Sequence, residues 1–139
     1  MFIMFRNRYL LPLGVLLLAM LSVLHDAPAV AGVQWTYLRL EVDFQCNNGV
    51  TTQGYSVYVV GAPEELGGWA MADAVKLNSD SYPTWTRKIN FTKLKPGDEV
   101  EWKCVVLKED DLTVLEWQPG PNNKVKMAFS PAPKSVGTF

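Results

Sequence analysis

Apolar and polar residues alternate strictly along one segment of the chain. Leu38, Leu40, Val42, Phe44 and Cys46 are apolar, and every residue between them is polar. Successive side chains of a β-strand point to opposite faces, so this pattern gives one apolar face and one polar face. The segment therefore predicts a half-buried strand over residues 38–46.

Six further segments carry similar patterns, at residues 55–60, 75–77, 85–91, 100–106, 112–117 and 125–129. Turn-forming sequences such as Asn47-Asn48-Gly49 and Lys95-Pro96-Gly97-Asp98 separate them, and no helical periodicity follows residue 31. Short strands at this spacing predict an all-β, antiparallel β-sandwich of about seven strands. The tail over residues 130–139 holds two prolines and is expected to be frayed.

The amino-terminal segment has a different composition. Arg6 and Arg8 precede an uncharged, leucine-rich run over residues 9–24, and Ala29-Val30-Ala31 follows. This order is typical of a secretory signal peptide cleaved after Ala31, while an uncleaved membrane anchor formed by residues 9–24 is the alternative. The sequence thus predicts a signal peptide at 1–31 and a β-sandwich at 32–139. The expected location is outside the cell or in the secretory lumen, with membrane contact only if the segment is retained.

Charge and histidine content exclude several functions. The chain has 13 basic and 14 acidic residues, which leaves no broad basic surface for nucleic acid. Its one histidine, His25, lies in the predicted signal, so a catalytic triad or a histidine-containing zinc site is excluded from residues 32–139. The carboxylate pairs Glu64-Glu65 and Asp110-Asp111 are interpreted as solvated loop residues and not as a glycosidase pair. We expect no enzyme activity, metal or cofactor.

Two features bear on covalent chemistry. Cys46 and Cys104 both fall on the inward side of their strands. Two buried thiols and one disulfide across the core are both compatible with that placement, and a secretory route favours oxidation. Asn90-Phe91-Thr92 is an N-glycosylation sequon, with Asn90 on the outward side of its strand.

The tryptophans divide into two groups. Trp85 and Trp102 occupy inward positions within strands, whereas Trp69 follows a Gly-Gly turn and Trp117 precedes the loop Pro119-Gly120-Pro121-Asn122. Flat, exposed rings at loops suit the apolar face of a sugar ring. The pattern alone also allows a protein-binding surface or a structural role.

The sequence resembles the starch-binding domain, carbohydrate-binding module family 20, in order and spacing from about Thr36 to Met127. The motifs that carry the resemblance are Val57-Tyr58-Val59-Val60-Gly61, Glu65-Leu66-Gly67-Gly68-Trp69, Leu77, Asp80, Tyr82-Pro83-Thr84-Trp85, Val100-Glu101-Trp102-Lys103, Leu115-Glu116-Trp117 and Pro121-Asn122.

This resemblance implies an immunoglobulin-like sandwich that binds α-1,4-linked glucan, such as starch, glycogen or maltooligosaccharides, at two sites without catalysis. At the first site, Trp69 and Trp117 would stack on glucose rings. The hydroxyls would then hydrogen-bond to Lys103, Gln118 and Asn122.

The second site would use Asp80 and Tyr82. Gln53 stands where some members present a stacking tyrosine, and the neighbouring Tyr55 is a candidate substitute. Trp85 is interpreted as core packing beneath this site. As an alternative function, the chain would be a scaffold or targeting subunit, or a truncated fragment, that brings an α-glucan-active enzyme to the polymer. Trp35 and Tyr37 are candidate docking residues for that enzyme.

Overall fold

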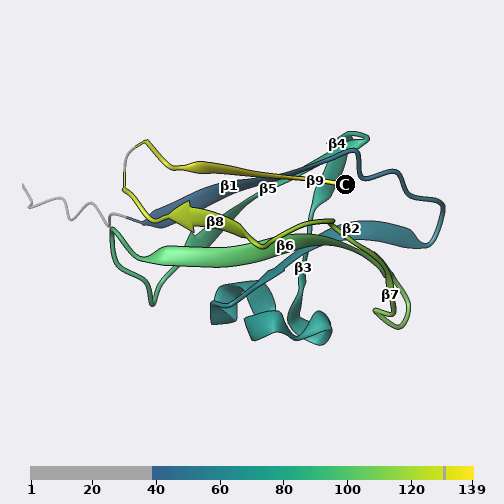
Figure 1. Cartoon of the computed structure of the whole chain (residues 1–139), viewed down its shortest axis with the longest axis horizontal. Helices are drawn as coiled ribbons and strands as arrows, with labels where there is room; N and C mark the ends of the chain where they lie inside the picture. The colour runs from purple at the N-terminus through teal and green to yellow at the C-terminus, as the bar shows by residue number, and fades with distance from the viewer. Residues whose placement is uncertain (1–38, 130) are drawn as a thin grey trace, which may run out of the picture. The chain divides into compact units, whose positions relative to one another are not determined.

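The computed structural model describes residues 39–129 and 131–139 as two β-sheets packed face to face (Figure 1). One sheet has the strand order β4 (Asn78–Ser81), β5 (Thr84–Phe91), β1 (Leu40–Asn47) and β9 (Lys134–Thr138). The other has the order β3 (Val75–Lys76), β2 (Tyr55–Gly61), β6 (Glu99–Lys108) and β7 (Val114–Trp117), and β8 (Asn123–Lys126) also pairs with β6. The predicted all-β sandwich is confirmed.

The core forms where the inward faces of the two sheets meet. In β1, Leu40, Val42, Phe44 and Cys46 are buried and alternate with half-buried polar residues, as the sequence pattern predicts. The ring of Phe44 meets the ring of Trp102 edge-on, with centroids 4.9 Å apart, a favoured geometry for aromatic pairs. The predicted core positions of Trp85 and Trp102 are also confirmed.

A disulfide joins Cys46 on β1 to Cys104 on β6, with Cα atoms 6.0 Å apart. The sequence left open whether these residues form a bond, and the structure shows that they do. Both residues are fully buried, so the bond crosses the interior and connects one sheet to the other. The sandwich is thus held together by a covalent cross-link as well as by apolar packing.

Residues 134–138 of the carboxyl-terminal tail form strand β9, so the predicted fraying of the tail over residues 130–139 was wrong for this stretch. Strand β9 runs parallel to β1, which also departs from an entirely antiparallel sandwich. The inward residues of β9 are Ser135 and Gly137. Neither is a large apolar residue, so the strand lacks the apolar alternation from which the other strands are predicted. The Trp102 Nε1–H donates to Ser135 Oγ at 2.9 Å, and this buried hydrogen bond ties β9 to the core.

Three other departures have simple causes. Strand β4 is exposed at every residue, as an edge strand can be, so it carries no period-two signal. With β9 it raises the strand count among the described residues from the predicted seven or so to nine. Two short 3-10 helices, η1 (Glu64–Trp69) and η2 (Met71–Asp73), are too short for helical periodicity. They lie outside the sandwich beside β2 (Figure 1).

Several predictions fall outside the described residues. These are the signal peptide over 1–31, the alternative anchor over 9–24, and the docking residues Trp35 and Tyr37. Asn90 is described, and it lies exposed on β5 as predicted. Within the two described ranges, no helix has the length and apolar character needed to cross a membrane.

Candidate functional site

Four residues from separate segments line one open pocket of about 290 Å³. They are Trp69 from η1, Lys103 from β6, Trp117 from β7 and Asn122 from the following loop. The two indole side chains are 37% and 41% exposed, whereas Trp102 is fully buried. The structure therefore brings together four of the five residues predicted for the first site, and it leaves both indoles partly accessible.

Trp69 is presented by an unusual backbone. Gly67, Gly68 and Trp69 all have positive φ angles, of 82°, 55° and 67°. A Cβ atom at Gly67 would lie 2.7 Å from the carbonyl oxygen of Asp73, so only glycine allows η1 and η2 to approach this closely. The Gly-Gly sequence before Trp69 thus shapes the turn that carries the indole.

Lys103 holds the loop that follows Trp117. Its ammonium group donates hydrogen bonds to the carbonyl oxygens of Gln118 at 3.0 Å and of Gly120 at 2.6 Å. An ammonium group has three N–H donors, so one is left for another acceptor. Lys103 therefore fixes the position of the loop and still has a donor at the pocket.

Gln118 is not a pocket residue, and the prediction that its side chain contacts sugar was wrong. The side chain is buried at 6% exposure, and its Oε1 accepts hydrogen bonds from the backbone N–H of Cys104 at 3.1 Å and from Asn123 Nδ2 at 2.7 Å. Its Nε2 donates to Asn123 Oδ1 at 2.9 Å. Because Trp117 points outward, strand alternation turns Gln118 inward, and this signal was present in the sequence.

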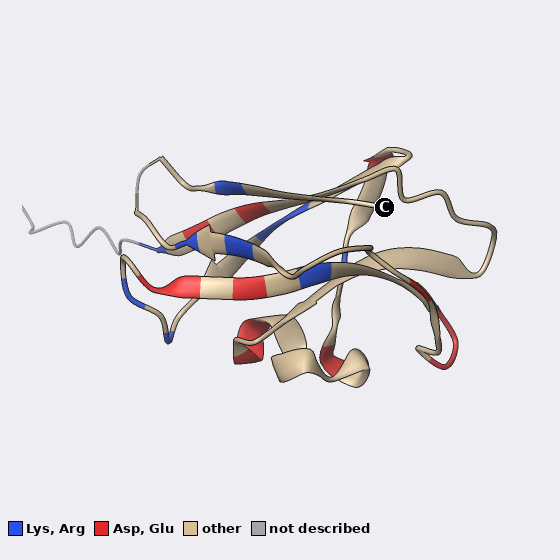
Figure 2. Cartoon of the chain, in the orientation of Figure 1, with Lys and Arg blue, Asp and Glu red and all other residues tan. Residues whose placement is uncertain are grey.

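Asn122 contacts a carboxylate beside the pocket. Its Nδ2 donates to Glu101 Oε2 at 3.1 Å, while the ammonium of Lys124 lies 3.2 Å from Glu101 Oε1. These hydrogen bonds, first from Asn122 and then from Lys124, lower the pKa of Glu101. Along β6, Glu99 and Glu101 are followed by Lys103, and Figure 2 shows acidic and then basic positions along this strand. Sequence reasoning gave Glu101 no role at the site.

The predicted second site is only partly assembled. Asp80 and Tyr82 lie exposed at the β4–β5 hairpin, and the Tyr82 hydroxyl donates to the Thr51 carbonyl oxygen at 3.4 Å. This contact brings Tyr82 to the loop that also carries the exposed Gln53. Tyr55, the candidate substitute stacking ring, is half-buried and packs against the hydrophobic core, and its contact with sugar stays a prediction.

Trp85 supports this second region from below, as predicted. Its ring meets Tyr82 edge-on at a centroid distance of 6.4 Å, and its Nε1 donates to the carbonyl oxygen of Gly49 at 2.7 Å. The backbone N–H of Gly49 in turn donates to the Pro83 carbonyl oxygen at 2.9 Å. The loop before β2 is thus fastened to the β4–β5 hairpin.

Three of the four carboxylates predicted to be solvated form surface ion pairs, while the half-buried Glu65 accepts a hydrogen bond from the Thr92 N–H at 3.0 Å. Glu64 pairs with Lys93, while Asp110 and Asp111 both pair with Lys108. Two larger pockets, one lined by Arg39 and Phe129 and the other by Glu64 and Asp73, contain none of the predicted site residues. Among the residues that the structure describes, no group of three His, Cys, Asp or Glu side chains could hold a metal ion.

Comparisons with known proteins agree on one family. The family model described as "Starch binding domain" matches residues 39–136. The chain is 47% identical over 91 residues to a glucan 1,4-alpha-maltotetraohydrolase of Roseateles saccharophilus, covering 64% of this chain and 16% of that enzyme. It is 44% identical over 85 residues to a cyclomaltodextrin glucanotransferase of Klebsiella oxytoca, covering 60% of this chain and 12% of that enzyme.

The fold of the chain is also similar to that of a solved structure. The family 20 carbohydrate-binding module of a maltotetraose-forming amylase from Pseudomonas saccharophila STB07 has a TM-score of 0.64 and 44% identity to this chain. The match covers 71% of this chain and 99% of that module. Thus the chain matches a whole binding module but less than a fifth of the length of the two enzymes.

The buried position of Gln118 gives a test of its structural role. Replacing Gln118 with Ala removes the acceptor of the buried Cys104 N–H, and an unsatisfied buried donor costs about 2 kcal/mol. We expect the free energy of unfolding, measured by urea denaturation, to fall by about that amount. Glu116→Ala, at an exposed position on β7, is the control and should change little. If Gln118→Ala leaves the stability unchanged but abolishes sugar binding, the structural role of this side chain is contradicted, and a direct contact with sugar is supported.

Proposed function

The chain belongs to the starch-binding domain family, and we propose that it binds starch or glycogen-type α-1,4-glucan, without catalysis, through the pocket of Trp69, Lys103, Trp117 and Asn122. The observation that carries this proposal is the convergence of two partly exposed indoles with a cationic donor and an amide in one pocket. An exposed indole leaves apolar surface in contact with water, so two in one pocket favour a partly apolar ligand.

The two indoles suit the shape of a glucan chain. A glucose ring presents axial C–H groups as a flat apolar face. Stacking on an aromatic ring removes this face and the facing side of the aromatic ring from water. Trp69 and Trp117 come from different segments but line the same pocket, so one oligosaccharide can contact both rings. We propose that successive glucose units stack on these two indoles.

The polar groups of the pocket complement the hydroxyl groups of such a ligand. The Lys103 ammonium retains one N–H donor after its two bonds to the loop, and the Asn122 amide offers donors and an acceptor. A hydroxyl group both donates and accepts, so either residue can satisfy it. These contacts would orient a sugar that stacking alone holds only loosely.

A second, weaker site is proposed at Tyr82 and Asp80, with Gln53 on the adjoining loop. Tyr82 is 51% exposed, and its ring rests on Trp85. This region offers one stacking ring where the first site offers two. We therefore propose that it contributes mainly by holding a second stretch of the same polymer.

A targeting role is the alternative proposal, and it is compatible with glucan binding. The two enzymes that the chain matches carry this domain as a small part of their length, and their names place them among glucan-acting enzymes. The domain would then bring an α-glucan-active enzyme to the polymer. Co-purification of such an enzyme with the protein is the measurement that tests this role, and its absence would contradict it.

The tryptophan pair gives the main test. Stacked aromatic rings contribute about 1 kcal/mol each beyond the area that they bury, so each single Ala substitution should weaken binding about fivefold or more. The double variant Trp69→Ala, Trp117→Ala should remain in the supernatant when incubated with granular starch. Phe129→Ala removes an exposed aromatic ring outside this pocket and is the matched control. Equal retention of the double variant and the wild type would refute the proposal.

The second site gives a prediction about polymer length. When two sites engage one polymer, the second binding event is intramolecular and raises the overall affinity. Tyr82→Ala should therefore reduce binding to starch granules much more than binding to a short maltooligosaccharide. Adsorption isotherms and calorimetry measure the two affinities. A variant that loses both equally would show that Tyr82 does not act as a separate site.

A further inference from the structure

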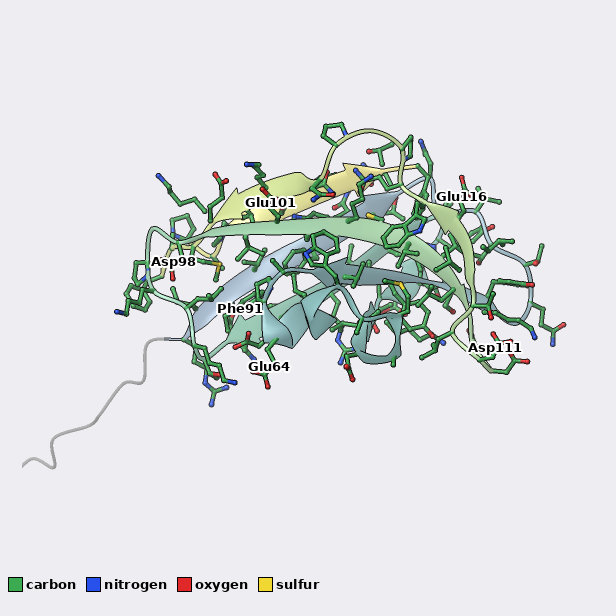
Figure 3. The ribbon with its side chains drawn as sticks, turned by 60° about the horizontal axis from the view of Figure 1, so that its bottom comes forward. Glu64, Phe91, Asp98, Glu101, Asp111 and Glu116 are labelled. Carbon is green, nitrogen blue, oxygen red and sulfur yellow. A yellow bond between two sulfur atoms is a disulfide. The ribbon has the colours of Figure 1, made fainter. Side chains whose placement is uncertain are left out.

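The side chain of Asn122 is held by a carboxylate that does not itself line the pocket. Asn122 Nδ2 donates to Glu101 Oε2 at 3.1 Å, and the other oxygen of the same carboxylate faces the ammonium of Lys124 at 3.2 Å. Glu101 lies on β6, where it is the direct cross-strand partner of Lys124 on β8. Figure 3 shows Glu101 on this part of β6, beside β8. Both oxygens of Glu101 therefore have partners.

This contact determines which way the Asn122 amide faces. An ionised carboxylate only accepts hydrogen bonds, so it can pair with the NH₂ group of the amide and not with its carbonyl oxygen. The same hydrogen bonds lower the pKa of Glu101, which keeps the group ionised. With the NH₂ group directed at Glu101, Asn122 Oδ1 lies on the opposite side of the amide and is available to a ligand.

The pocket then presents one hydrogen-bond donor and one acceptor at fixed positions. Lys103 supplies a donor, because an ammonium group cannot accept, while the oriented Asn122 supplies an acceptor. A pair of neighbouring hydroxyls on one sugar ring can satisfy both groups at once, with one hydroxyl accepting from Lys103 and the other donating to Asn122. An amide free to rotate would present this arrangement only part of the time.

We infer that Glu101 is a positioning residue of the glucan site, which fixes the Asn122 amide so that its oxygen accepts a hydrogen bond from a sugar hydroxyl. This inference rests on the proposed function of the pocket. The backbone carbonyl of Glu101 also accepts the N–H of Ala62 at 3.0 Å, in the segment before η1. A side-chain substitution leaves that backbone bond in place, so it tests the carboxylate alone.

The chain offers a matched pair of substitutions. Glu99 and Glu101 lie two residues apart on the same face of β6, and both pair with Lys124, but only Glu101 contacts Asn122. Glutamine keeps the shape of glutamate but can donate as well as accept, so Glu101→Gln removes the constraint on the amide. We expect Glu101→Gln to bind maltoheptaose about three- to tenfold more weakly by calorimetry, a loss of about one hydrogen bond. Glu99→Gln should bind like the wild type.

A third variant separates the amide contact from the ion pair. Lys124→Met removes the cation but leaves the carboxylate of Glu101 beside Asn122. An exposed ion pair contributes little, so maltoheptaose affinity should stay within about twofold of the wild type. If Lys124→Met weakens binding as much as Glu101→Gln does, the ion pair is responsible and the inference is overturned.

A double-mutant cycle tests whether Glu101 acts through Asn122. Once Asn122 is replaced by Ala, Glu101→Gln should cause no further loss of affinity, because the group it positions is gone. Independent, additive losses would contradict the inference. The side-chain NH₂ resonances of Asn122 give a second measurement: Glu101→Gln should shift them in the unliganded protein, and Glu99→Gln should not. Unchanged resonances in Glu101→Gln would also overturn the inference.

The outcome for the wild type separates this inference from the proposed function. If the wild type fails to bind maltoheptaose, the proposed function fails. If the wild type binds and Glu101→Gln binds equally well, glucan binding stands and only the role of Glu101 is lost.

Discussion

The cross-link between Cys46 and Cys104 is the constraint on which both candidate sites depend. Cys46 lies at the end of β1, just before the loop that Gly49 and Trp85 fasten to the β4–β5 hairpin. Cys104 exchanges hydrogen bonds with Gln118, which directly follows Trp117: its N–H donates to the Gln118 side chain, and its carbonyl oxygen accepts the Gln118 N–H. A disulfide that closes a loop of this length contributes about 4 kcal/mol in the chain-entropy model. One covalent bond thus joins the backbone segments beneath two separate surfaces.

The first site is supported by a buried network. The reciprocal amide pair of Gln118 and Asn123 fills the space beside the disulfide, where a Cβ atom on Gly137 would lie only 2.5 Å from Gln118 Oε1. Buried hydrogen bonds of this kind hold their partners in one arrangement, because any other arrangement leaves a polar group unsatisfied. The loop from Trp117 to Asn122 is therefore fixed at its start by the buried Gln118 side chain and in its middle by the bond from Lys103 to the Gly120 carbonyl oxygen. At the second site, the hydrogen bonds of Trp85 and Gly49 hold the backbone, but the Tyr82 side chain itself has one long, exposed hydrogen bond and its ring packing on Trp85.

The sequence predicts those features that apolar alternation encodes. The strands that line the core show it, and so does the inward placement of Cys46, Trp85 and Trp102. Strand β9 was missed because Ser135 and Gly137 are its buried residues, and its position depends on the Trp102 indole, a contact distant in sequence. Trp69 and Trp117 are identified by their loop positions, whereas the resemblance assigns Lys103 and Asn122 to the same site. Only the fold shows that the four segments meet in one pocket. The resemblance assigned Gln118 to the pocket, whereas its position next to the outward-pointing Trp117 places its side chain in the interior.

Preorganisation would allow the proposed glucan pocket, although small and open, to bind a flexible, hydrated sugar. A lysine and an asparagine on a surface normally lose rotational freedom when they bind a ligand, which reduces affinity. Here the Lys103 ammonium is already held by two loop carbonyls, and the Asn122 amide is already held by Glu101. The entropy of ordering these groups is therefore lost on folding, where the disulfide and the core offset it, and not on binding. Trp69 and Trp117, with few rotatable bonds, need little further ordering, so most of the stacking energy remains available for affinity.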